Sequence, residues 1–288
     1  MWRQSDEELS RGELGVQEDS RTPPPKTEDG APSIGVTEMG FRFVVNFLRY
    51  DSGMTKAKTR MTRVLDRLEK FYGKPKAPRP VDAYEMVLHR NCGYPQSDAL
   101  CDKGFAALKK EIGLRPEEIL AAPVAKLREV MRVGGIVPGL RAQRLREIAA
   151  RVETEFGGSL RAVLKRPLAE AKKALRKFPT LGEAGAEKIL LFTKTAPVAA
   201  VPSNCIHVPL RLGFGRESKN WAASYKSAQE AILAELPEAC EAQLRAYLLF
   251  KQHGRTLCKS ARPKCEECPV TDECGYFAAT RGRVRGPA

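Results

Sequence analysis

Four cysteines near the C-terminal end constrain this chain more than any other feature of its sequence. They fall within 17 residues, separated by gaps of six, two and five, and they are Cys258, Cys265, Cys268 and Cys274. Thiolates bind soft or borderline metals, and four of them close a tetrahedral site or hold an iron–sulfur cube. The spacing therefore predicts that these four side chains are metal ligands.

The spacing alone leaves two metal centres open. Zinc ribbons usually pair two CxxC knuckles across a longer loop, whereas only Cys265 and Cys268 form a knuckle here. The compact loop favours a [4Fe–4S] cluster as the cofactor, with zinc as the alternative. The remaining cysteines are scattered and are interpreted as small buried hydrophobes: Cys92, Cys101, Cys205 and Cys240.

The charge of the chain points to a polyanionic partner. Lys and Arg number 49 against 35 Asp and Glu, which gives a net charge of +14, and nucleic acid is the commonest partner of so basic a protein. No stretch approaches the roughly 18 apolar residues of a membrane span, and residues 1–15 lack the apolar core of a secretory signal. We therefore expect a protein of a reducing compartment with no membrane attachment, where clustered cysteines are metal ligands.

Hydrophobic spacing predicts an all-α fold. Residues 1–40 are polar and Pro-rich and are predicted to be disordered, while the apolar run 41–50 fits either a strand or a buried helix turn. The folded body is expected to begin near Met61, and 74–80 reads as a rigid basic linker. From residue 81 onward, apolar residues recur at spacings of three and four with breaks at Gly and Pro, which is typical of successive amphipathic helices.

A helical hairpin is predicted between Leu175 and Phe192. Its tight turn, Pro179–Gly182, would present backbone N–H groups and a helix N-terminus to a DNA phosphate. Three cations between the first two clustered cysteines would contact phosphate in the same way. The predicted DNA contacts are therefore Thr180, Leu181, Gly182, Gly185 and Lys188 in the hairpin, and Lys259, Arg262 and Lys264 in the cysteine loop.

These motifs together resemble one family. The C-x6-C-x2-C-x5-C spacing after a helix that ends His253-Gly254-Arg255 resembles the C-terminal iron–sulfur loop of the endonuclease III family of DNA glycosylases. The hairpin resembles the helix-hairpin-helix of the same superfamily, with Thr180 in place of the usual first glycine. The segment 134–145 resembles the loop that wedges an apolar side chain into the gap left by a flipped base. The candidate wedges are Ile136, Val137 and Leu140, for which packing at a helix end is the alternative.

The resemblance implies two helical lobes with a DNA-binding cleft between them. A helical barrel domain with the hairpin would span 82–199. A [4Fe–4S] cluster domain would be built from both chain ends, 61–81 and 200–280, followed by a basic tail at 281–288. The resemblance covers the chain from about Asp82 to its C-terminal end.

The catalytic positions of the family are substituted in this chain. Ala184 occupies the place of the amine that attacks the sugar in bifunctional members, and Lys188, one turn later, is interpreted as a surface lysine. The place of the family carboxylate falls at Pro202 or at Cys205, depending on the match. The candidates for the catalytic group are therefore Asn204, Glu183, Glu187 and His89. His89 lies within a loop 86–98, and the residues of this loop that would line a base pocket are His89, Asn91, Tyr94 and Gln96.

The predicted function is that of a monofunctional DNA glycosylase of base excision repair. Such an enzyme flips a damaged or mismatched base out of double-stranded DNA and hydrolyses its N-glycosidic bond. A divergent protein of the same fold that binds damage without chemistry is one alternative, and a metal-binding interaction protein is another. We expect a monomer that is cytoplasmic and nucleoid-associated in a bacterium, and a nuclear location stays open.

Overall fold

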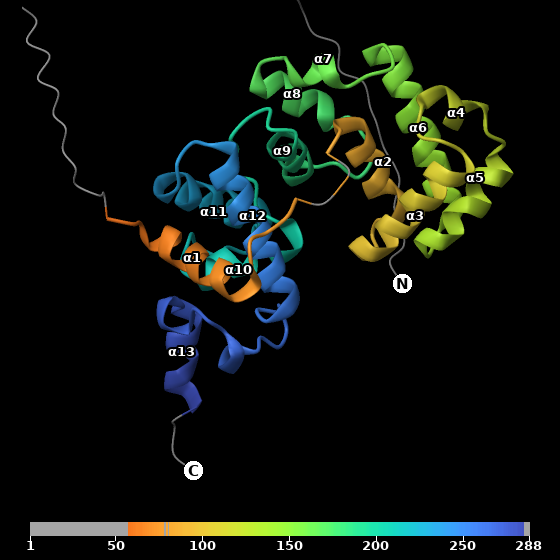
Figure 1. The fold of residues 1–288 in the computed structure, drawn as a ribbon. Coiled ribbons are helices and arrows are strands. Elements are labelled where there is room, and N and C mark those ends of the chain that lie inside the picture. Colours follow the sequence, from red (N-terminus) through yellow and green to blue (C-terminus); the bar gives the residue numbers. More distant parts are fainter. Residues whose placement is uncertain (1–56, 78, 80, 285–288) are drawn as a thin grey trace, which may run out of the picture. The chain divides into compact units, whose positions relative to one another are not determined.

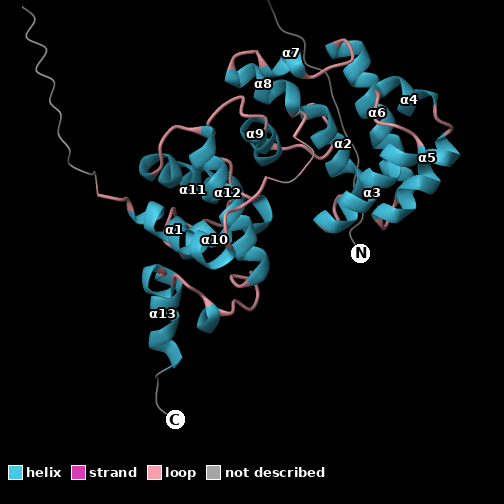
Figure 2. Ribbon diagram, in the orientation of Figure 1, coloured by secondary structure: helices cyan, strands magenta, loops and turns pink. Residues whose placement is uncertain are grey.

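The computed structural model describes residues 57–77, 79 and 81–284, with the backbone alone for 281–284. Within these ranges the chain forms helices and connecting loops and contains no strand, so the all-α prediction is confirmed (Figure 2). The predictions for 1–40, the run 41–50 and residues 285–288 lie outside the described residues. None of the described helices is both long enough and apolar enough to cross a membrane.

Thirteen α-helices and four short 3-10 helices make up the described part of the chain (Figure 1). Their bounds, in chain order, are α1 Arg60–Tyr72, α2 Ala83–Gly93, α3 Asp98–Glu111, α4 Pro116–Ala121, α5 Val124–Val130, η1 Met131–Gly134, α6 Pro138–Phe156, α7 Arg161–Leu164, α8 Leu168–Leu175, α9 Glu183–Phe192, η2 Ser203–Cys205, α10 His207–Arg211, α11 Trp221–Glu235, α12 Cys240–Thr256, η3 Cys265–Glu267, η4 Thr271–Glu273 and α13 Gly275–Val284.

The first hydrophobic core is built by α2 to α9. Helix α6 contributes a stripe of fully buried side chains that includes Leu145, Ile148 and Val152, at the spacing of one helix face. Helix α2 begins where the Asp82 carboxylate accepts hydrogen bonds from the first free N–H groups. It packs against α3, α6 and α9, and this packing brings its polar face to the hairpin.

The second core joins both ends of the described chain. Met61, Val64, Leu65 and Leu68 of α1 are fully buried among side chains of α10, α11 and α12. Helix α1 starts at the predicted point, because the Thr59 hydroxyl accepts a hydrogen bond from the Thr62 N–H. The four cysteines of the C-terminal loop follow α12, so this second core supports them.

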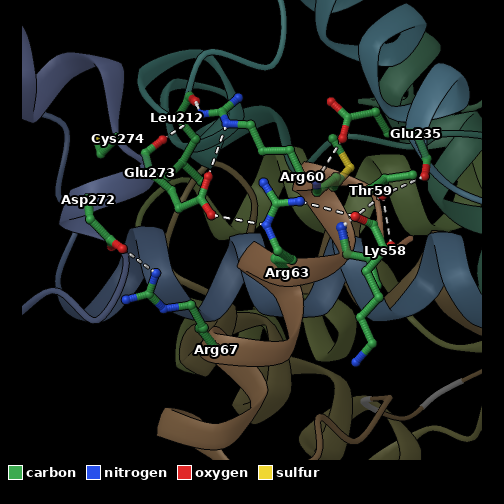
Figure 3. Close-up of polar contacts among 12 residues, drawn as sticks. Lys58, Thr59, Arg60, Arg63, Arg67, Leu212, Glu235, Asp272, Glu273 and Cys274 are labelled. Carbon is green, nitrogen blue, oxygen red and sulfur yellow. Dashed lines mark hydrogen bonds and ion pairs between the residues drawn. The ribbon is translucent and has the colours of Figure 1, made fainter. Parts of the chain in front are cut away.

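Three arginines of α1 hold the cysteine loop against the second core. Arg60, Arg63 and Arg67 lie at helical spacing and reach the turn η4 just before Cys274 (Figure 3). Arg67 binds Asp272 at 2.6 Å, and both Arg60 and Arg63 bind the Glu273 carboxylate, at 3.3 and 3.4 Å. The α1 stripe thus ties the start of the folded chain to its end, a contact that the sequence patterns did not reveal.

Two sequence expectations about local structure are wrong. Residues 86–93 are the second half of α2 and not a loop, because their apolar side chains complete the buried face of that helix. Residues 281–284, assigned to a basic tail, continue α13 to Val284.

Candidate active-site cleft and cysteine pocket

The helical hairpin opens onto a cleft of about 400 Å³. One wall comes from the hairpin turn and the first turn of α9. The opposite side comes from the loop between α2 and α3 and from η2, with α12 behind. The predicted site residues that this cleft brings together are Thr180, Gly182, Glu183, Gly185, Lys188, Asn204 and His89.

Polar side chains of α2 fix the hairpin turn. Arg90 donates from Nε to the Thr180 carbonyl at 2.9 Å, and Asn91 donates from Nδ2 to the Pro179 carbonyl at 3.1 Å. The Thr180 hydroxyl donates to the Asn91 Oδ1 at 3.3 Å. Asn91, predicted to line a base pocket, is instead fully buried. It therefore positions the turn and is too buried to line a base pocket.

Thr180 adopts a backbone conformation that favours glycine. Its φ is +64°, in the left-handed region where a β-branched side chain is strained. The contacts from Arg90 and Asn91 overdetermine this geometry and hold it. The backbone strain of threonine in place of glycine at this position is thus offset by polar contacts with α2.

The turn presents the start of α9 to the cleft. Gly182 is the residue before the helix, and no side chain caps the first N–H groups of α9. Leu181, predicted as a DNA contact, buries its side chain in the first core, so only its backbone faces outward. An uncapped helix start of this kind binds anions such as phosphate.

Lys188 is not the surface lysine expected from the sequence. Its side chain is partly buried and lines the cleft. Burial, together with the nearby positive charge of Lys251, lowers its pKa to about 8. Its closest ring contact is Phe192, with Nζ 5.3 Å from the ring centroid. Within the described residues it has no ion-pair partner.

A clamped carboxylate lies beside Lys188. Asp98, the first residue of α3, accepts from Lys251 Nζ at 2.6 Å and from Arg255 Nη1 at 2.7 Å. Burial opposes ionisation of Asp98, but the two cations of α12 together hold its pKa below the ordinary value. This carboxylate is therefore ionised at neutral pH and lines the cleft.

The two glutamates of α9 have different surroundings. Both accept from Lys172 Nζ, Glu183 at 2.8 Å and Glu187 at 2.6 Å. Glu187 is 3% exposed and also accepts from the Tyr225 hydroxyl at 2.6 Å and from Gln229 at 2.8 Å. These bonds make Glu187 a brace between α8, α9 and α11, and it is not among the residues that line the cleft. Glu183 remains at the edge of the cleft.

His89 and Asn204 both reach the cleft. His89 lies on α2, and its Nε2 is 2.7 Å from Oδ1 of Asp102. Asn204 is exposed on η2. Ala184 also lines the cleft, whereas Pro202 does not.

Two aromatic side chains flank the cleft, and the sequence singled out only one of them. Tyr94 is 38% exposed and carries the Arg90 guanidinium 4.5 Å from its ring centroid. Trp221 is 45% exposed and stacks on Tyr225 at a centroid distance of 4.9 Å. Exposed aromatic faces of this kind stack on nucleobases. Trp221 was not predicted, because the only local sequence feature beside it is the Asn220 cap of α11, which indicates a helix start.

The candidate wedge residues project from the start of α6. Ile136, Val137 and Leu140 are 59%, 47% and 42% exposed, and Val137 has a φ of +51°. Gly135 brings this loop against the Gln96 side chain of the cleft, where an added Cβ would lie 3.2 Å from Cγ. The exposed apolar tip therefore stands beside the cleft.

All four clustered cysteines line one small pocket. It also includes Arg211 and His253, and Val270 anchors the loop in the second core. Within the described residues, no set of three or more His, Cys, Asp or Glu side chains is arranged to hold a single metal ion. Four thiols around a shared pocket, with few other polar groups, are nevertheless the donor set that an iron–sulfur cluster takes.

Two side chains of the pocket lining contact the cysteine sulfurs. Arg211 donates to Cys258 Sγ at 3.6 Å and to the carbonyls of Lys259 and Ser260 at 2.8 and 2.6 Å. His253 Nε2 lies 3.6 Å from Cys268 Sγ, and burial lowers its pKa to about 4, so the ring is neutral. Donors in these positions orient thiolate ligands.

The cations of the cysteine loop face solvent. Lys259, Arg262 and Lys264 are all exposed. Lys264 pairs with Glu267 at 3.0 Å, whereas the other two have no ion pair within the described residues. The two exposed and unpaired side chains are thus the ones whose charges are available to a polyanion.

Comparison with known proteins relates this geometry to one fold class. No family model matches the chain. It is 24% identical to endonuclease III of Bacillus subtilis over 191 residues, which cover 66% of this chain and 80% of the relative. It is 24% identical to endonuclease III of Thermotoga maritima over 212 residues, covering 73% and 92%.

Solved structures show the same fold at lower identity. The structure of a non-covalent endonuclease III–DNA complex matches with a TM-score of 0.61 at 20% identity, covering 77% of this chain and 95% of that one. A thermostable thymine-DNA glycosylase matches with a TM-score of 0.60 at 19% identity, covering 76% and 97%. The fold is therefore that of the helix-hairpin-helix DNA glycosylases.

In sequence, the chain resembles the endonuclease III-like DNA glycosylases at low identity, as a divergent relative of them would. The catalytic positions that the resemblance led us to seek differ in this chain, with Ala184 in place of the amine and Pro202 or Cys205 in place of the carboxylate.

Proposed function

We propose that this protein is a DNA N-glycosylase of base excision repair that acts in the cleft beside the hairpin. One observation carries the proposal. The hairpin turn, the exposed aromatic faces and an ionised carboxylate all line the same cavity of about 400 Å³. A glycosylase needs this combination, because it must grip phosphate, stack a flipped base and stabilise a cationic sugar in one place.

The backbone of the hairpin grips the DNA strand. The free N–H groups at the start of α9 take a phosphate, while Lys259 and Arg262 contact the backbone further along. The apolar tip at Ile136 and Val137 fills the gap that the flipped base leaves. The partner in this proposal is double-stranded DNA, bound by a monomer.

Asp98 is the carboxylate that we assign to the chemistry. It is ionised and lines the cleft near Asn204, and a fixed negative charge stabilises the positive charge that develops on the sugar as the base leaves. Asn204 can orient a water or the sugar by hydrogen bonding, but it carries no charge. Trp221 and Tyr94 provide the faces between which the base stacks.

The cysteine pocket receives the cofactor in this proposal. Cys258, Cys265, Cys268 and Cys274 would hold a [4Fe–4S] cluster, whose thiolate bonds cross-link the loop that bears Lys259 and Arg262. We also propose that the two cores correspond to the barrel domain 82–199 and the cluster domain of 61–81 and 200–280. Visible absorption with matched iron and sulfide content tests the cofactor, since zinc gives no such absorption.

Base release from duplexes tests the function. A panel of duplexes, each with one damaged or mismatched base, is incubated with the protein and analysed with and without alkali. Ala184 carries no amine, so strand cleavage should require alkali. Cleavage without alkali would instead assign an amine of the cleft, Lys188 or Lys251, to attack on the sugar.

A matched pair of variants tests the assigned carboxylate. Asp98→Asn should lower base release about 10²-fold, the scale of losing one electrostatic group at a reacting centre. Glu183→Gln, which changes a carboxylate at the cleft edge, should stay within about fivefold. Tight duplex binding with no base release across the panel would favour the alternative, a damage-binding protein without chemistry.

A further inference from the structure

A second chamber lies behind the cleft. Its volume is about 410 Å³, which is within the range of about 300–1,000 Å³ typical of small-molecule sites. It is lined by residues 73–76 and 79 of the linker between α1 and α2 and by the C-terminal half of α12. Of these two cavities, the hairpin turn lines only the cleft, and the linker lines only the rear chamber.

The two cavities share four side chains. His89, Asp98, Lys188 and Lys251 line both the cleft and the rear chamber. The rear chamber therefore adjoins the cleft at these residues, and a ligand within it would contact the linker and the shared side chains without meeting the hairpin turn.

Both carboxylates of the rear chamber already have a basic side chain as partner. Asp98 is held by Lys251 and Arg255 at 2.6 and 2.7 Å, and Asp102 lies 2.7 Å from His89. No other carboxylate of the described residues lines the chamber. Neither carboxylate forms an ion pair with the linker cations.

Four cations of the rear chamber have no ion-pair partner among the described residues. They are Lys74, Lys76 and Arg79 on the linker and Lys188 among the shared side chains. A partly buried ammonium without a counter-charge is unfavourable, and the lowered pKa of Lys188 reflects that imbalance. An anion in the chamber would supply the missing charge.

We propose that the rear chamber is a binding site for a phosphate-bearing anion, held by Lys74, Lys76 and Arg79 from the linker and by Lys188 from the shared side chains. Phosphate suits this set, because several flexible ammonium groups and one guanidinium can each donate to its oxygens. The linker cations of this site lie outside the cleft that is proposed to bind the duplex, and anion binding to them does not depend on the proposed glycosylase activity. The phosphate belongs either to a free anion, such as a pyrophosphate or a nucleotide, or to the end of a DNA strand.

Calorimetry on the full-length protein tests this site. Inorganic pyrophosphate and a 5′-phosphorylated trinucleotide are titrated separately at constant ionic strength. The test variant is Lys74→Ala/Lys76→Ala, which alters only exposed linker residues. The control is Lys165→Ala/Lys173→Ala, which removes the same charge from exposed positions outside the chamber. Circular dichroism and base release confirm that both variants are folded.

We expect near-stoichiometric binding of at least one probe to the unaltered protein. The linker variant should weaken it at least about tenfold, the scale of losing charge-assisted hydrogen bonds, while the control stays within about twofold. Tighter binding of pyrophosphate identifies a free anion as the ligand, and tighter binding of the trinucleotide identifies a strand end. Absence of binding for both probes, or equal weakening in the two variants, overturns the proposal and leaves the glycosylase assay unaffected.

Discussion

The hairpin and the cysteine loop both face the DNA in the proposed complex, but their shapes are held by different means. The hairpin turn is fixed by the protein's own hydrogen bonds, chiefly those of Arg90 and Asn91. The cysteine loop has short 3-10 turns, one buried anchor at Val270 and ion pairs to α1 (Figure 3). The difference teaches that the polypeptide's own hydrogen bonds fix the hairpin turn, while the cysteine loop has fewer such supports and would be held by the proposed cofactor.

The largest effect should come from removing one predicted cluster ligand. Cys265→Ser should abolish the visible absorption and most of the soluble, folded protein, because binding of the metal centre is coupled to folding. Cys240→Ser is the control, since Cys240 lies outside the pocket and is about as exposed. A Cys265→Ser protein with unchanged melting temperature and DNA affinity would show that the loop does not need the cofactor.

Removing a polar side chain that supports the hairpin turn should have a smaller effect on the stability of the protein. Asn91→Ala removes the contacts to Pro179 and Thr180 and should lower the free energy of unfolding by about 1–3 kcal/mol, because buried partners are left unsatisfied. Denaturant unfolding measures the change. Thr180→Gly loses the hydroxyl contact but relieves the positive φ, so it should remain within about 1 kcal/mol of the parent.

A third change concerns the one uncompensated charge on the hairpin's second helix. The pKa of Lys188 is lowered from 10.5 to about 8. Below pH 8 the charged side chain therefore destabilises the folded state, and this destabilisation disappears as the pH rises from 8 to 10.5. Lys188→Met should therefore stabilise the protein by about 1 kcal/mol at pH 7. The gain should fade between those two pH values, as followed by thermal melts across the pH range.

Lys173→Met serves as the control for that experiment. Lys173 is exposed on α8, so its removal should leave the pH dependence unchanged. A gain for Lys188→Met that is constant with pH would mean that added apolar packing, and not the loss of charge, stabilises the variant.

The smallest effect should distinguish cations within the cysteine loop. Lys259→Ala should reduce the slope of log K against log salt for duplex binding by about 1, since one phosphate contact is lost. Lys264→Ala should reduce it less, because Lys264 already pairs with Glu267. Equal slopes for both variants and the parent would place the loop away from the DNA backbone.

Several features of this protein follow from local sequence alone. The all-α class, the start of α1 and the hairpin could be predicted because apolar spacing, capping residues and turn residues act within a few positions of one another. The four cysteines were identifiable for the same reason, since their ligand spacing is written in 17 consecutive residues. The tip at Ile136 and Val137 was located by the family resemblance of the segment 134–145, and not by local spacing.

The tertiary structure decided which side chains share a cavity. Lys188 was predicted to be a surface residue because the sequence of α9 does not indicate its neighbours. Asp98 and Lys251, which line the same cleft, lie far from Lys188 along the chain. From the sequence, Glu187 was a candidate catalytic group. In the structure its carboxylate accepts hydrogen bonds from Tyr225 and Gln229 of α11. The charge state and role of a polar side chain depend on burial and on distant partners, which packing sets and local spacing does not encode.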